Sequence, residues 1–116
     1  MDHKIKLVIR KIGEQITRQL LLTANDAGWP CIGFDDGDGF EKESRYEELV
    51  SHCMNLDEIT LFFHSPQKDR TAWVYLVYGN DGYDLICDNS IVDGFEQLVM
   101  EKMTKYTENI EQHLFT

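Results

Sequence analysis

The sequence lacks any continuous apolar stretch of the length that a membrane-spanning helix needs, which is about 20 residues. Its first residues, MDHKIKLVIRKIGEQ, also lack an apolar segment followed by the small-residue cleavage site of a secretory signal peptide. We therefore expect a cytoplasmic protein that does not bind membranes.

Cysteine is scarce, and its spacing excludes two common uses. The three cysteines, Cys31, Cys53 and Cys87, are an odd number at wide spacing, which favours reduced and mostly buried thiols over a disulfide framework. No two of them lie at the short spacing, about two to four residues, that is typical of a zinc site. His52 and Cys53 are neighbours on a predicted helix, so their side chains diverge by about 100°. We expect no metal and no cofactor.

Recognisable catalytic and nucleotide-binding motifs are missing as well. The glycines form neither a phosphate-binding loop nor a dinucleotide fingerprint, and the GxSxG pattern of serine hydrolases is absent. The sequence therefore favours a protein that is not an enzyme. A small enzyme whose site assembles from distant residues stays an alternative, and it would need a concave pocket with perturbed titrating groups.

Basic residues are outnumbered, because 11 lysines and arginines face 21 aspartates and glutamates, which gives a net charge of −10. The imbalance is uneven: residues 1–18 contain five basic and two acidic residues, whereas the remainder contains six and nineteen. A negatively charged domain repels phosphate backbones, so direct nucleic-acid binding is not expected. The natural electrostatic partner is a protein with a basic surface, although an acidic surface can also serve solubility alone.

The acidic, glycine-rich stretch CIGFDDGDGFEKES, at 31–44, raises the question of a calcium loop. The helix–loop–helix calcium motif needs an oxygen ligand at its fifth position and a glycine at its sixth. In the most favourable register, which begins at Asp36, those positions hold Phe40 and Glu41. We therefore expect a hairpin-like turn, in which Gly37 and Gly39 supply positive φ and the aspartates bond nearby backbone amides.

The spacing of apolar residues predicts an α+β fold in a single domain, residues 1–116, with an antiparallel β-meander packed against helices. The expected order is α-β-α-β-β-β-α. Helices are expected at 4–25, 44–54 and 90–112, and strands at 31–34, 58–64, 71–78 and 83–88. The segment KIKLVI, at 4–9, could also serve as a strand.

Each predicted helix has an apolar face. The first carries Ile5, Val8, Ile9, Ile12, Ile16 and Leu20; the second carries Tyr46, Leu49, Val50 and Cys53; the third carries Val92, Phe95, Val99, Met103, Tyr106 and Ile110. Ser90 and Asp93 have the spacing of a capping box, which predicts the start of the third helix there.

The strand predicted at 71–78 is apolar on both faces. Alternation places Trp73, Tyr75 and Val77 on one face and Val74, Leu76 and Tyr78 on the other. A sheet that helices cover on one side only is normally polar on its other side. The pattern therefore predicts either cover on both faces or a surface kept for a partner.

The stretch WVYLVYGNDGYDLICDNS, at 73–90, follows an acidic glycine-rich turn, a predicted helix and the segment LDEITLFFH. This arrangement resembles a group of small, largely uncharacterised bacterial proteins that are associated with phages, plasmids and other mobile DNA. The resemblance covers about residues 33–100 and rests chiefly on Trp73, Asp84 and the Gly-Asn-Asp-Gly hairpin at 79–82. It departs where those proteins tend to have aspartate and tyrosine followed by threonine, because here Asp88 is followed by Asn89 and Ser90. It implies a fold and a genomic setting, and carries over no catalytic residues.

Together these features predict a non-enzymatic, acidic protein-binding module, an accessory or inhibitory factor of a mobile element that occupies a basic surface on a host protein. The expected contact residues are Asp35, Asp36, Asp38, Glu47, Glu48, Trp73 and Tyr75. A homodimer stays open. The alternatives are a toxin-immunity protein, a secretion chaperone with an apolar sheet surface, and a small enzyme.

Overall fold

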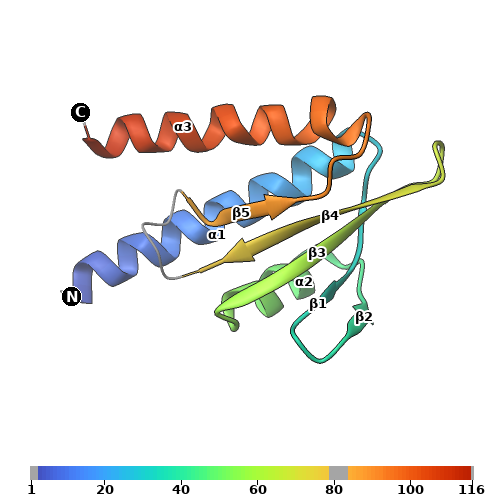
Figure 1. The fold of residues 1–116 in the computed structure, drawn as a ribbon. Helices are drawn as coiled ribbons and strands as arrows, with labels where there is room; N and C mark the ends of the chain where they lie inside the picture. The colour runs from blue at the N-terminus through green and yellow to red at the C-terminus, as the bar shows by residue number, and fades with distance from the viewer. Residues whose placement is uncertain (1–2, 79–83, 116) are drawn as a thin grey trace.

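The computed structural model describes residues 3–78 and 84–115 of the chain (Figure 1). These residues form three α-helices, one π-helical turn and five strands, which confirms the predicted α+β class. In chain order the elements are α1 (His3–Asp26), β1 (Cys31–Asp35), β2 (Phe40–Lys42), α2 (Tyr46–Met54), β3 (Glu58–Ser65), β4 (Arg70–Val77), β5 (Ile86–Asn89), the π-turn η1 (Glu96–Met100) and α3 (Glu101–Phe115).

The described strands form one antiparallel sheet with the order β2-β1-β3-β4-β5. Strands β3 and β4 pair over their full length, from Glu58 opposite Val77 to Ser65 opposite Arg70, and β5 completes the predicted meander. The alternation pattern does not reveal β2, which has only three residues, all exposed. Strand β5 begins at Ile86 instead of residue 83, and the predicted turn at 79–82 lies outside the described residues.

Helices cover one face of this sheet. The side chains of β3 and β4 alternate between buried and half-buried, and the buried set joins the helices in one hydrophobic core. Figure 1 shows α1 and α2 behind the strands, with α3 running alongside α1. The strand residues on the covered face are Ile59, Leu61, Phe63, Ala72, Val74 and Leu76. Of the two predicted alternatives, cover on both faces is therefore not found among the described residues, and a surface kept for a partner stays a prediction.

Helix α1 includes the segment 4–9, so the helical interpretation of KIKLVI is confirmed. Ile12, Ile16 and Leu20 are buried as predicted, but Val8 is 50% exposed. Figure 1 gives the reason: the first turns of α1 extend past the ends of the strands, where no sheet is left to cover them. None of the described helices is both long enough and apolar enough to span a bilayer.

The carboxyl-terminal helix begins later than predicted. The Ser90 hydroxyl accepts a hydrogen bond from the Trp73 amide of β4 at 2.8 Å, so it caps no helix and the capping-box prediction is wrong. The helical segment starts at Phe95, after Gly94 at φ 91°. The residues that were predicted to face the core from this helix are buried or half-buried: Phe95, Val99, Met103, Tyr106 and Ile110.

Candidate functional site

The face of the sheet that no described helix covers carries a row of aromatic side chains, which we call the aromatic row: Phe40, Phe62 and Trp73. Phe62 lies directly opposite Trp73 across β3 and β4. The Phe40 ring meets the Phe62 ring edge to face at 5.4 Å. The row therefore runs across the sheet from β2 to β4, and its side chains are half-buried or exposed.

Gly33 of β1 makes room for this row. A Cβ atom built at Gly33 would lie 2.5 Å from the Phe40 ring and 2.3 Å from the backbone oxygen of Glu41. Because glycine has no side chain, the Phe40 ring can fold back over β1 and reach Phe62. Phe40 stays 53% exposed in this position, so the ring is available for contact with another molecule.

Carboxylates lie beside the aromatic row on the same face. Tyr75 follows Trp73 on this face of β4, and its hydroxyl donates a hydrogen bond to Glu58 at 2.7 Å, which raises the pKa of Tyr75. Asp88 of β5 lies opposite Tyr75, and Asp35 of β1 lies opposite Thr60 of β3. The uncovered face thus combines one exposed and two half-buried aromatic rings with carboxylates along one side of them.

The acidic stretch at 35–39 forms the predicted turn. Gly37 and Gly39 have φ values of 107° and 115°, a region that favours glycine. The Asp35 carboxylate accepts hydrogen bonds from the amides of both glycines, and the Asp36 carboxylate accepts one from the Asp38 amide at 3.0 Å. This hairpin joins β1 to β2, and it follows Asp35, which lies opposite Thr60 on the uncovered face.

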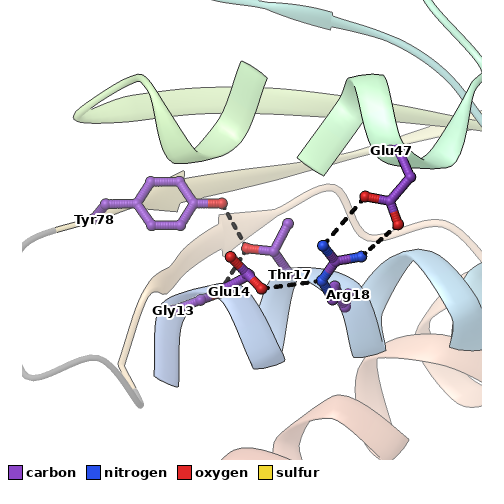
Figure 2. Close-up of polar contacts among 6 residues, drawn as sticks. All are labelled: Gly13, Glu14, Thr17, Arg18, Glu47 and Tyr78. Carbon is purple, nitrogen blue, oxygen red and sulfur yellow. Dashed lines mark hydrogen bonds and ion pairs between the residues drawn. The ribbon is translucent and has the colours of Figure 1, made fainter. Parts of the chain in front are cut away.

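The structure separates Glu47 and Glu48 from that turn. Both belong to α2, which lies on the covered side of the sheet (Figure 1). Glu47 forms a bidentate ion pair with Arg18 of α1, at 2.9 and 3.2 Å, and Arg18 also contacts Glu14 (Figure 2). The hydrogen bonds from Arg18 lower the pKa of Glu47. Glu47 therefore joins two helices, and the five predicted carboxylates do not form one surface.

Glu48 belongs to the one group that could hold a metal among the described residues. Ligand atoms of Glu43, Glu48 and His52 lie within 4.8 Å of one another. Glu43, however, already accepts hydrogen bonds from the Arg45 guanidinium and the Arg45 amide, which lower its pKa to about 2. A cation would have to displace Arg45, and the His52 ring packs against the Phe34 ring with a centroid distance of 4.5 Å and a tilt of 33°. The i, i+4 spacing of Glu48 and His52 was the signal that could have indicated this cluster.

A histidine on the uncovered face has an aspartate and a hydroxyl as neighbours. His64 Nδ1 lies 3.0 Å from the Thr71 hydroxyl, and its Nε2 lies 3.6 Å from Asp69. These residue types also build hydrolase triads. Here all three belong to the β3–β4 hairpin, and the Asp69 side chain is 94% exposed, so water reaches the group. We therefore assign no catalysis to it.

A partly buried polar network ties Tyr78, which follows β4, to α1. The Thr17 hydroxyl donates to the Gly13 backbone oxygen at 2.8 Å and accepts from the Tyr78 hydroxyl at 2.7 Å (Figure 2). The Tyr78 ring packs over Gly13, and a Cβ atom there would still lie at an ordinary contact distance of 3.4 Å. Burial raises the pKa of Tyr78 and raises that of the neighbouring Cys53 to about 11, so both stay protonated at neutral pH.

The three thiols should differ sharply in reactivity. Burial raises the pKa of Cys31 to about 12 and that of Cys53 to about 11, whereas Cys87 is exposed, so the prediction of buried thiols fails for Cys87. Because the thiolate is the nucleophile, we expect a thiol reagent at pH 8 to label one cysteine in the native protein and three after unfolding. Cys87→Ser should abolish the native labelling. Equal labelling of all three would contradict the buried positions.

Comparison of the chain with protein-family models, with curated proteins and with solved structures finds no match. Sequence reasoning identified Trp73 and Tyr75 on the uncovered face but missed Phe40 and Phe62. Alternation along β3, in which Thr60, Phe62 and His64 share a face, could have indicated Phe62, whereas nothing local indicates that Phe40 joins it.

Proposed function

We propose that this protein is a non-enzymatic protein-binding module whose contact surface is the uncovered face of the sheet. The observation that carries the proposal is the aromatic row, Phe40, Phe62 and Trp73, on a face without helical cover. Contiguous exposed apolar surface marks interaction sites, and aromatic residues supply much of the binding energy at interfaces. A partner that covers these rings would remove apolar area from water, which is the main driving force of association.

Charge supports a partner with a basic surface. The cross-strand row next to the aromatic row contains Asp35 and Asp88, and Glu58 lies one position further along the same face, so these carboxylates follow one side of the aromatic row. Lys42 lies opposite Gly33 on this face. The whole chain carries a net charge of −10. Complementary charge accelerates encounter with a basic partner and disfavours acidic ones, including a second copy that presents the same face.

The setting that we propose is a mobile genetic element, for which the protein acts as an accessory or inhibitory factor on a host protein. The support is the resemblance of residues 33–100 to small acidic proteins of phages and plasmids. An acidic surface that occupies a basic functional site is a direct way for a protein without a catalytic centre to inhibit another protein. A self-associating chaperone is the competing assignment, and it predicts a dimer through the same face.

The experiment captures partners from a bacterial lysate and then measures the affinity of the identified partner for defined variants. Phe40→Ala removes a ring that is 53% exposed, and Leu22→Ala on α1 is the matched control because Leu22 is 48% exposed outside the sheet. We expect Phe40→Ala to weaken binding by about tenfold or more, as interface aromatic residues commonly do, and Leu22→Ala to leave it unchanged. Equal affinities for both variants would place the interface elsewhere.

A second set of variants tests the charge. Replacing Asp35, Asp36 and Asp38 together with asparagine preserves the side-chain oxygens that bond the turn amides. We expect association to slow and binding to weaken by about tenfold, since each exposed pair contributes up to about 1 kcal/mol. The difference from wild type should shrink as salt rises. A partner that binds the triple variant as fast as wild type at low salt would exclude the acidic turn from the interface.

A further inference from the structure

A groove of about 360 Å³ runs between β5 and α3, on the side of β5 away from the aromatic row. Its floor contains the side chains of Ile86, Met100 and Met103. Four carboxylates line it: Asp84, Glu96, Glu108 and Glu111. Methionine side chains are flexible and polarizable, so such a floor adapts to apolar groups of different shape.

The groove offers hydrogen-bond acceptors, because its own donors are already used. Thr104 and Thr107 donate their hydroxyl hydrogens to backbone carbonyls of the same helical segment, at 3.0 and 3.1 Å. The Asn89 side-chain amide donates to the Ser90 backbone oxygen and to the Glu96 carboxylate. None of the described residues that line the groove is a lysine, arginine or histidine. A ligand must therefore bring both the positive charge and the donors.

The edge of β5 is partly closed to strand addition. The Asn89 amide donates to the Asp88 carboxylate at 2.9 Å, so that edge donor is satisfied by its own neighbour. A ligand in the groove would therefore be bound through its side chains and not through backbone pairing with β5. The lining residues of η1 and α3 extend from Glu96 to Glu111, which is about 22 Å along a helix at 1.5 Å per residue. This length suits a peptide segment that presents several side chains in a row.

We infer that this groove binds a lysine- or arginine-bearing segment of a partner protein, with apolar residues between the charged ones. The ammonium or guanidinium groups bond the carboxylates of Glu108 and Glu111, and the apolar residues contact the methionine floor. The inference goes beyond the proposed function, because it assigns a second surface that shares no residue with the aromatic row. The two surfaces meet at β5, where Asp88 faces one and Ile86 the other.

The test measures the binding of a fluorescein-labelled peptide of alternating lysine and leucine to the full chain by fluorescence anisotropy at low salt. Glu108→Gln with Glu111→Gln removes two charges from the groove. Asp93→Asn with Glu101→Gln is the matched control, because it removes the same charge from exposed positions outside the groove. We expect the groove pair to weaken peptide binding by about tenfold and the control pair by less than about twofold, since exposed pairs act at short range.

Two further binding measurements distinguish a peptide-binding groove from binding by charge alone and from binding at the aromatic row. Spermidine supplies charge without apolar residues, so it should bind the wild-type chain more weakly than the peptide does; equal affinity would overturn a peptide groove. Phe40→Ala should leave peptide binding unchanged. If Phe40→Ala weakens peptide binding while the groove pair does not, the peptide binds the aromatic row and the groove inference is wrong. Equal losses in the groove pair and the control pair would show an effect of net charge alone.

Discussion

Replacing Phe95 with alanine should lower the free energy of unfolding by about 3–5 kcal/mol, the usual cost of removing a phenylalanine from a packed core. Phe95 is fully buried at the start of the carboxyl-terminal helical segment. Its ring meets the Trp29 ring edge to face at 5.3 Å and the Phe63 ring at 5.3 Å. It thus connects the residues after α1, the middle of the sheet and the last helix, so a cavity there affects all three.

Urea unfolding monitored by circular dichroism measures this effect. Because single domains are typically stable by about 5–15 kcal/mol, the variant should unfold at a clearly lower urea concentration or fail to fold. Phe40→Ala deletes the same ring from an exposed position and should cost much less. A similar loss for both variants would contradict the assignment of Phe95 to the core and of Phe40 to the surface.

Replacing Gly33 with alanine should detach β2 from the sheet. The added methyl group would lie 2.3 Å from the Glu41 backbone oxygen, which cannot move without separating the strands. Such overpacking costs about 1–3 kcal/mol. The φ angle of Gly33 is not positive, so the effect is steric and needs no backbone strain. We expect faster proteolysis within residues 36–43 and weaker partner binding, because Phe40 loses its place on β1.

Gly13→Ala is the control for this change, because both substitutions add one methyl group to a buried glycine. At Gly13 the new Cβ would lie 3.4 Å from the Tyr78 ring, an ordinary contact distance. Alanine is also favoured over glycine in a helix by about 1 kcal/mol, so stability should stay equal or rise. If Gly33→Ala kept the wild-type rate of proteolysis in 36–43, the packing of Phe40 over Gly33 would not hold β2 in place.

Short-range patterns predicted much of the fold, because helical and strand periodicity is a local property of the chain. The meander and the buried residues Leu49, Val50 and Cys53 of α2 follow from such patterns. The capping box failed because Ser90 has a competing partner, the Trp73 amide, which belongs to a strand that precedes it by 17 residues. A capping box depends on one hydroxyl. It does not form when that hydroxyl instead accepts a hydrogen bond from a backbone amide of another element.

The candidate surfaces required contacts between distant residues. Sequence reasoning grouped Glu47 with the aspartates of the turn, since they lie close along the chain. The ion pair of Glu47 with Arg18, at a separation of 29 residues, instead fixes it between α1 and α2. The groove was not foreseen either, because Ile86 and Glu108 come from segments whose packing no local pattern specifies.

The sequence by itself determined the α+β class, the acidity, the aspartate turn with its two glycines of positive φ, and the apolar character of both faces of β4. These are properties of composition and local alternation, which need no knowledge of long-range packing. Only the tertiary structure decided which face of β4 the helices cover and that Phe40 crosses Gly33 to join Phe62. When both faces of a strand are apolar, the alternation pattern does not show which face is buried. The packing of the whole helical layer against the sheet determines it.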